Sequence, residues 1–143
     1  MSSVRHTGIV VSDLDRSLFF YSRLLGLRVA KRMDESGPYI DAVTGLEAVS
    51  MTTVKLGAED GSLVELLLFH SHPGKLSEEK SLYDKGISHI AFTVKDVEAE
   101  YEKLKQQGVI FISSPRISPD GYAKVAFCKD PDGNFVELVE VLS

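Results

Sequence analysis

The stretch from Asp60 to Phe69, DGSLVELLLF, decides how the chain folds. An Asp-Gly pair followed by a run of leucine, valine and phenylalanine indicates a turn and then a buried strand. The run nevertheless has a carboxylate, Glu65, at its centre. An ionised carboxylate in apolar surroundings costs several kcal/mol unless a cation or a hydrogen-bond donor meets it. We therefore expect the fold to supply such a partner for Glu65.

The same pattern returns near the C-terminus, where residues 132–141 read DGNFVELVEV. Glu137 follows Glu65 at an offset of 72 residues (137 minus 65). A second match pairs HTGIVVSDLDRSLFFYSRLLGL, which begins at His6, with HIAFTVKDVEAEYEKLKQQGV, which begins at His89, at an offset of 83 (89 minus 6). Each half of the chain thus opens with a histidine and closes with a glutamate. Such internal similarity indicates two copies of one supersecondary unit.

The repeated unit predicts an α+β fold of two pseudo-symmetric βαβββ modules within one domain, residues 1–143. Module one covers about 4–70, a connection covers about 71–86, and module two covers about 87–142. Asp13 is a good helix N-cap, and Gly26 is well placed to end that helix. The expected elements of module one are a strand at 5–11, a helix with Leu14, Leu18, Tyr21 and Leu25 on one face, a strand at 27–33, a loop at 36–50 and a hairpin of 51–56 with 62–69. Those of module two are a strand from about 87, a helix at 96–107, a loop at 113–121 and a hairpin of 122–128 with 135–141.

Composition limits the partners and the compartment. A net charge of -5 argues against nucleic acid or an anionic membrane as a partner. The longest apolar run falls well short of the roughly 20 residues that a membrane span needs. The start, MSSVRHTG, lacks the apolar region of a secretory leader. A single cysteine, Cys128, fits a reducing compartment, and we expect a cytoplasmic protein with this thiol packed in a strand.

The four repeated residues His6, Glu65, His89 and Glu137 form the candidate site. Taken alone, a strand histidine is commonly a core residue, and a strand glutamate commonly faces water. Two equivalent modules whose sheets face each other would bring all four residues to one point, in the concave interior of a cupped sheet. Two imidazoles and two carboxylates suit Ni²⁺, Co²⁺, Mn²⁺, Fe²⁺ or Zn²⁺. The pattern therefore predicts a divalent-metal site.

Such a site has room for chemistry. Four protein ligands on a six-coordinate ion leave two positions for water or a chelating substrate. The ion polarises a carbonyl, and a carboxylate that leaves the metal takes the neighbouring proton. Outside this set, His70 and His72 are interpreted as exposed loop histidines, and Arg116 as a solvated loop arginine.

The chain resembles the vicinal oxygen chelate superfamily, also called glyoxalase/bleomycin-resistance/dioxygenase. The segments that carry the resemblance are HTGIVVSDLDRSLFFYSRLLGL, SHIAFTVKDV and FCKDPDGNFVELVEV, and it extends over almost the whole chain. It implies paired βαβββ modules around a metal, a small carbonyl-containing substrate and often a homodimer. It assigns the metal to His6, Glu65, His89 and Glu137, either within one chain or between two chains.

The ligand set is most similar to that of bacterial glyoxalase I, a lyase that isomerises the hemithioacetal of methylglyoxal and glutathione. By this likeness Glu137 is the principal base and Glu65 the second. Those enzymes contact glutathione through an arginine four residues after the first histidine and an asparagine four residues after the first glutamate. Val10 and Phe69 stand there in this chain, so we expect a different carrier or none.

Three alternatives remain open at the level of sequence. Methylmalonyl-CoA epimerase moves a proton beside a carbonyl in a similar way, but its second ligand is usually glutamine. Extradiol dioxygenases hold iron with two histidines and one glutamate. Antibiotic-sequestering relatives bind small molecules without a metal, and they have typically lost the four ligands that are intact here.

Overall fold

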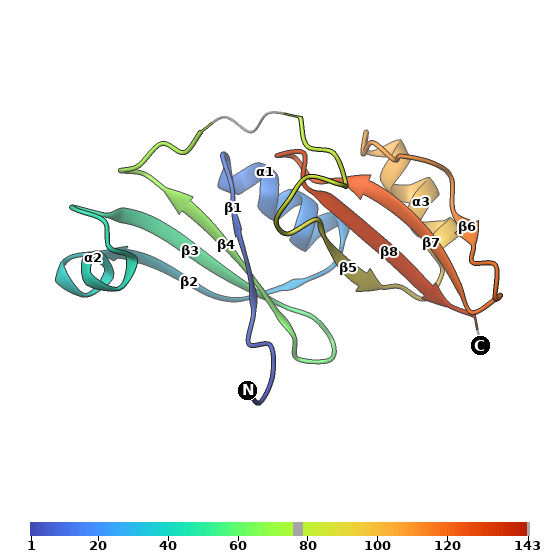
Figure 1. Cartoon of the computed structure of the whole chain (residues 1–143), viewed down its shortest axis with the longest axis horizontal. Coiled ribbons are helices and arrows are strands. Elements are labelled where there is room, and N and C mark those ends of the chain that lie inside the picture. The colour runs from blue at the N-terminus through green and yellow to red at the C-terminus, as the bar shows by residue number, and fades with distance from the viewer. Residues whose placement is uncertain (76–78, 143) are drawn as a thin grey trace. The chain divides into compact units, whose positions relative to one another are not determined.

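The computed structural model describes residues 1–75 and 79–142, so residues 76–78 of the expected connection and residue 143 lie outside the described part. The chain divides into two compact units, residues 1–76 and 77–143. Each unit is a four-stranded mixed sheet with helices, which confirms the α+β class and the two repeated βαβββ modules (Figure 1).

Unit 1 arranges its strands in the order β1-β4-β3-β2. The first strand runs parallel to β4, and the other neighbours are antiparallel. Helix α1 continues into a π-helical segment, η1, and packs on β4. The elements of the unit are β1 (Thr7–Val10), α1 (Leu14–Leu18), η1 (Phe19–Leu24), β2 (Arg28–Ser36), α2 (Pro38–Thr44), β3 (Ser50–Gly57) and β4 (Leu63–Phe69).

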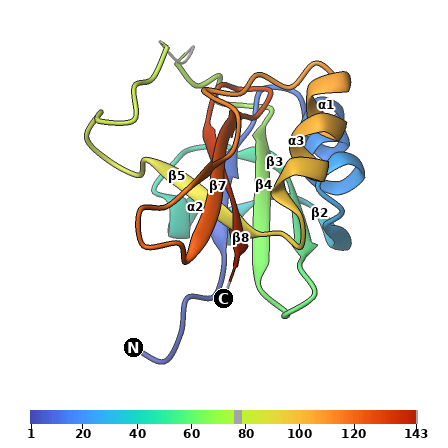
Figure 2. The same ribbon diagram turned by 90° about the vertical axis from the view of Figure 1, so that its right-hand side faces the viewer.

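Unit 2 repeats this arrangement, with the strand order β5-β8-β7-β6 and a parallel pairing of β5 with β8. Its helix, α3, packs on β7 and β8 (Figure 2). The elements of the unit are β5 (His89–Thr93), α3 (Val97–Gln106), β6 (Arg116–Ile117), β7 (Ala123–Lys129) and β8 (Phe135–Val141).

Equivalent hydrogen bonds fix the helix in both units. Asp13 caps α1 by accepting from the backbone N–H of Arg16 at 3.0 Å, and Asp96 caps α3 by accepting from that of Ala99 at 3.0 Å. An aspartate at this position satisfies a backbone donor that the first turn leaves free. The predicted N-cap at Asp13 is confirmed. The residue after each first strand is also tied to the last strand, by bonds from Val11 N to Leu67 O and from Val94 N to Val139 O, both 2.9 Å.

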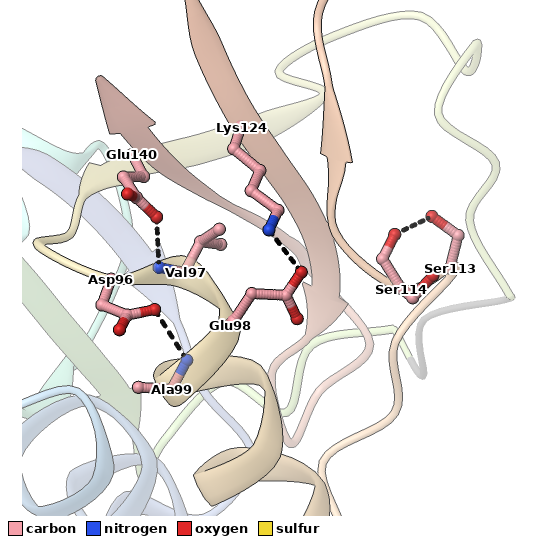
Figure 3. Close-up of polar contacts among 8 residues, drawn as sticks. All are labelled: Asp96, Val97, Glu98, Ala99, Ser113, Ser114, Lys124 and Glu140. Carbon is pink, nitrogen blue, oxygen red and sulfur yellow. Dashed lines mark hydrogen bonds and ion pairs between the residues drawn. The ribbon is translucent and has the colours of Figure 1, made fainter. Parts of the chain in front are cut away.

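In unit 2, two further side chains hold α3 against its sheet (Figure 3). Glu140 of β8 accepts a 2.9 Å hydrogen bond from the backbone N–H of Val97. Lys124 of β7 forms a 2.5 Å ion pair with Glu98 in the first turn of the helix. Carboxylates at a helix N-terminus are favoured because the free N–H groups there carry partial positive charge. The first turn of α3 is therefore held by side chains from two strands, β7 and β8.

The helical region of unit 1 buries a different face from the predicted one. Leu14 and Tyr21 are buried as expected, but Leu18 and Leu25 are only partly buried. Phe20, adjacent to Tyr21, is buried with it, and the two rings meet edge to face at a centroid distance of 4.8 Å. The prediction assumed a continuous α-helix, whereas the chain changes to a π-helix at Phe19.

Two segments that we expected to be loops contain regular structure. The loop predicted at 36–50 contains α2, which runs from Pro38 to Thr44 and is followed by Gly45, a C-cap residue with φ of 70°. Ile40 of this helix packs with Val49 and Met51, which explains why the segment folds onto the sheet. The loop predicted at 113–121 contains β6, the fourth strand of the second sheet. Among the described residues, no helix is long and apolar enough to cross a membrane.

Candidate metal-binding pairs

His6 and Glu65 lie together in unit 1. Glu65 is in β4, where its Cα partner on β1 is Gly8, and His6 is two residues before that glycine. Residues two apart on a strand share a face, so both side chains point to the same side of the sheet. His6 Nε2 lies 3.9 Å from Glu65 Oε1. The side chains are 34% and 15% exposed, so the pair is partly accessible to solvent.

A third residue, Lys55, completes this group. It is the cross-strand partner of Glu65 in the β3–β4 hairpin, and its Nζ lies 3.8 Å from Glu65 Oε2. Lys55 and His6 together are the partners that Glu65 was expected to need. We did not predict Lys55 from the sequence, although the hairpin register could have revealed it. Gly57 pairs with Leu63 beside the turn. Two residues further from the turn on each strand, Lys55 therefore stands opposite Glu65.

The second pair, His89 and Glu137, lies in unit 2. His89 opens β5 and Glu137 is in β8, and His89 Nε2 lies 3.1 Å from Glu137 Oε2. The side chains are 35% and 21% exposed. The cross-strand partner of Glu137 is Phe127, whose ring meets the His89 ring edge to face at 5.1 Å. On the other side of the imidazole, Ser88 Oγ lies 3.1 Å from His89 Nδ1.

The structure therefore brings the four predicted ligands together as two pairs, each within its own unit. Each pair offers one imidazole nitrogen and one carboxylate on one face of a sheet, which are donor types suited to a first-row divalent ion. Within residues 1–75 and 79–142, no three or more histidine, cysteine, aspartate or glutamate side chains are placed so that they could hold a metal ion together. The four-ligand site thus stays a prediction.

The other polar residues singled out in the sequence lie outside these pairs. His70 is exposed, as expected, but its Nε2 lies 2.8 Å from the buried Thr52 hydroxyl, which in turn donates to Asp34 at 2.6 Å. His72 is partly buried rather than exposed, and its Nδ1 contacts the Ser71 hydroxyl at 2.7 Å. Arg116 is exposed on β6 rather than in a loop.

Cys128 is a structural residue. Its side chain is fully buried in β7, as predicted. Burial, with a smaller contribution from the Asp130 carboxylate, raises the pKa of the thiol to about 12. Because the thiolate is the reactive form of cysteine, the neutral thiol is inert near neutral pH.

Comparison with known proteins identifies the family. The model of the Glyoxalase/Bleomycin resistance protein/Dioxygenase superfamily matches residues 3–138. The chain therefore belongs to this superfamily, in agreement with the resemblance noted in the sequence.

Individual relatives match this chain over most of their length, and two solved structures match its fold. A lactoylglutathione lyase of Pseudomonas aeruginosa is 35% identical over 145 aligned positions, covering 94% of this chain and 80% of the relative. The crystal structure of a glyoxalase family protein from Bacillus cereus matches with a TM-score of 0.90 at 22% identity, covering 100% and 96% of the two chains. The trypanothione-dependent glyoxalase I of Leishmania major matches with a TM-score of 0.70 at 27% identity, covering 98% and 87%.

Proposed function

We propose that this protein is a divalent-metal-dependent lyase or isomerase that moves a proton at the carbon beside a carbonyl. The observation that carries the proposal is the repeated His–Glu pair, found at equivalent places in both sheets. Superfamily membership and the relative named lactoylglutathione lyase support it. The substrate is a small carbonyl compound, and the protein is expected to act as a cytoplasmic homodimer.

The residues that would hold the metal are His6, Glu65, His89 and Glu137, contributed by one chain or by two copies of it. Their donor set fits Ni²⁺, Co²⁺, Zn²⁺, Mn²⁺ or Fe²⁺. When bound, such an ion would supply Lewis-acid polarisation of the substrate carbonyl. The His89 imidazole is oriented by the chain itself, since Glu137 lies at one ring nitrogen and Ser88 at the other.

The two glutamates are not equivalent, and the difference supports a division of roles. Glu65 faces two cationic or potentially cationic groups, His6 and Lys55. Glu137 has the aromatic ring of Phe127 opposite it, and its Oε2 lies 3.1 Å from His89 Nε2. A neighbouring lysine stabilises the deprotonated form of a carboxylate and makes it a weaker base. Glu137 has no lysine opposite it, so it is better suited to accept a proton from the substrate. We therefore assign Glu137 as the principal base and Glu65 as the second.

The surroundings of the first pair argue against glutathione as the carrier. Val10 and Phe69 stand where glutathione-using enzymes are expected to have arginine and asparagine. Both residues are on the Glu65 face of the sheet, because Val10 follows Gly8 by two residues and Phe69 follows Glu65 by four. Phe69 packs against the apolar cluster of Ile40, Val49 and Met51 and offers no side-chain donor. We expect weak turnover of the glutathione hemithioacetal.

A non-catalytic small-molecule or antibiotic-binding protein is the second candidate. Lys55 favours it, because an ion pair with this lysine can satisfy Glu65 without any metal. A binding protein of this kind would keep both pairs as polar lining. The two candidates differ in whether Glu137 must exchange a proton.

The decisive variant is Glu137→Gln. Glutamine keeps the size and one oxygen ligand but cannot act as a base at neutral pH. The wild-type protein is incubated with Ni²⁺ and a panel of 2-oxo thiohemiacetals, acyl-CoA esters and 2-hydroxy ketones in deuterated water. Exchange at the carbon beside the carbonyl is expected in the wild type and should fall by roughly two to four orders of magnitude in Glu137→Gln.

Glu140→Gln is the matched control, because Glu140 lies on the same strand and its role is to cap α3 (Figure 3). This variant should exchange at the wild-type rate. A wild-type protein that exchanges none of the panel, yet binds an aromatic or antibiotic ligand tightly without metal, would favour the binding protein instead.

A further inference from the structure

We propose that Lys55, together with Lys31, anchors an anionic group of the substrate, so that the substrate is a small carbonyl compound bearing a carboxylate. This inference rests on the proposed function and narrows its substrate class. The two units keep the same histidine and glutamate, but they differ at the residue opposite the glutamate.

That residue is Lys55 in unit 1 and Phe127 in unit 2. The two are equivalent by the repeat, since both hairpins place them opposite the glutamate and both glutamates follow them by ten residues (65 minus 55, 137 minus 127). Glu137 is about as buried as Glu65, at 21% and 15% exposure, and is stable beside an aromatic ring. The fold therefore does not require a lysine at this place, and a role beyond neutralising the strand glutamate is indicated.

A second lysine lies in the same row of the sheet. In the β2–β3 pairing, Lys31 is the Cα partner of Lys55, which in turn is the partner of Glu65. Cross-strand partners project from the same face, so both lysines share the face of the candidate metal-binding pair. Like charges directly opposite each other destabilise a sheet. The three cross-strand partners Lys31, Lys55 and Glu65 thus comprise two cations and one carboxylate, and a bound anion would neutralise the remaining positive charge.

The charge balance changes further when a metal engages Glu65. The carboxylate that faces Lys55 is then shared with a dication, and the two ammonium groups are left with less compensation. Glu35, the acidic residue of β2 on this face, does not supply that compensation, because it lies two cross-strand pairs away along this face and is 3.5 Å from the Thr53 hydroxyl. Lys55 is 34% exposed, so its ammonium group can reach a ligand in solvent.

A substrate carboxylate would meet this need. The Lys55 ammonium lies 3.8 Å from a carboxylate oxygen of Glu65, so an anion on Lys55 lies beside the candidate metal ligand and not on it. A substrate that carries its carboxylate a few atoms from its carbonyl would present the carboxylate to Lys55 and the carbonyl to the metal that the candidate pair would hold. The two lysines would thus anchor the substrate, a role that an arginine and an asparagine fulfil in glutathione-using enzymes and that Val10 and Phe69 cannot fulfil here.

The experiment compares two ligands that differ only at the far end. The first is 2-oxoglutarate, and the second is 2-oxopentanoate, which has the same chelating 2-oxo acid but no distal carboxylate. Binding to the Ni²⁺-loaded full chain is measured by calorimetry. We expect the wild type to bind 2-oxoglutarate about fivefold to tenfold more tightly, as one charge-assisted contact allows.

Lys55→Met should remove this preference, and Lys55→Arg should retain it. Lys124→Met is the matched control, because Lys124 is also a strand lysine paired with a glutamate, but its partner is Glu98 of α3 (Figure 3). The control should keep the wild-type preference. Circular dichroism spectra establish that each variant is folded before binding is compared.

A separate readout uses the metal alone. Removing a cation beside Glu65 should tighten Ni²⁺ binding by about twofold to fivefold in Lys55→Met, as expected for loss of a partly exposed charge interaction. A wild type that takes up no metal would overturn the proposed function and this inference with it. A metal-loaded wild type with equal affinity for both ligands, or a Lys55→Met variant that keeps the preference, would overturn the lysine anchor alone.

Discussion

Replacing Asp130 with alanine should destabilise the second hairpin markedly. Asp130 is only 5% exposed and lies in the turn between β7 and β8. Its Oδ1 accepts hydrogen bonds from the backbone N–H groups of Asp132 at 3.0 Å and Asn134 at 2.8 Å. Its Oδ2 accepts from the Asn134 side-chain amide at 3.0 Å. The aspartate therefore organises the whole DPDGN turn.

The first hairpin shows what remains when this aspartate is absent. Ala58 occupies the equivalent place, 72 residues earlier (130 minus 58). Its turn keeps the same two backbone hydrogen bonds, from Ala58 N to Ser62 O at 2.9 Å and from Gly61 N to Ala58 O at 3.0 Å. The alanine variant should therefore still fold with the backbone turn intact, but without the three hydrogen bonds that the carboxylate accepts.

The size of the destabilisation follows from those three hydrogen bonds. A hydrogen bond to a charged group contributes about 1.5–3 kcal/mol, but interactions within one turn are not additive, and removing the carboxylate also removes the cost of burying it. We expect Asp130→Ala to lower the free energy of unfolding by about 2–3 kcal/mol. Urea unfolding followed by circular dichroism measures this change, because the chain has no tryptophan to report by fluorescence.

The control is Asp60→Ala in the first hairpin. Asp60 is fully solvent-exposed, and hydrogen bonds from the Ser62 hydroxyl and then its backbone N–H hold the pKa of the Asp60 carboxyl below its ordinary value. Its removal should shift the urea midpoint much less. Equal shifts in the two variants, or an Asp130→Ala protein as stable as the wild type, would refute the reasoning.

Three further predictions concern burial and assembly. Ser17 is fully buried and, among the described residues, its hydroxyl has no hydrogen-bond partner, so Ser17→Ala should raise the free energy of unfolding in urea by about 1 kcal/mol, and a decrease in stability would contradict this. The Cys128 thiol has a folded-state pKa of about 12 against an ordinary value of 9.0, so its contribution to stability is complete below pH 9 and is lost as the pH rises toward 12. The urea midpoint of Cys128→Ala should therefore fall less steeply than that of the wild type over this pH range. An equally steep fall in both proteins would exclude the thiol as its cause. Sedimentation at micromolar concentration should show a homodimer, and a monomer would count against the expected assembly.

The sequence predicted those parts of the fold that the repeat makes visible. The two Asp-Gly turns followed by apolar runs located β4 and β8, the predicted cap at Asp13 located α1, and the repeat located α3. Helix α2 and strand β6 were missed because they have no periodic pattern of their own. Two residues of strand carry no detectable alternation, and α2 folds because Ile40 finds an apolar surface elsewhere in the chain.

The repeat singled out four residues and predicted that they meet at one point. The structure places each histidine within 3.9 Å or less of the glutamate of its own unit, and the joint site of all four stays a prediction. Lys55 was missed because it breaks the repeat, and a search for equivalent residues passes over such a position. Lys55, on which we base the proposed substrate class, is thus a position at which the two modules differ.

We propose that the two His–Glu pairs hold one metal ion per chain. Elemental analysis of the purified wild type, after incubation with Ni²⁺ or Zn²⁺ and removal of free metal, tests it directly. His89→Ala is the variant and His72→Ala the control, since His72 lies outside both pairs and contacts Ser71. We predict about one divalent ion per chain in the wild type and in His72→Ala, and a severe reduction in His89→Ala. The same near-zero metal content in all three proteins would contradict the claim.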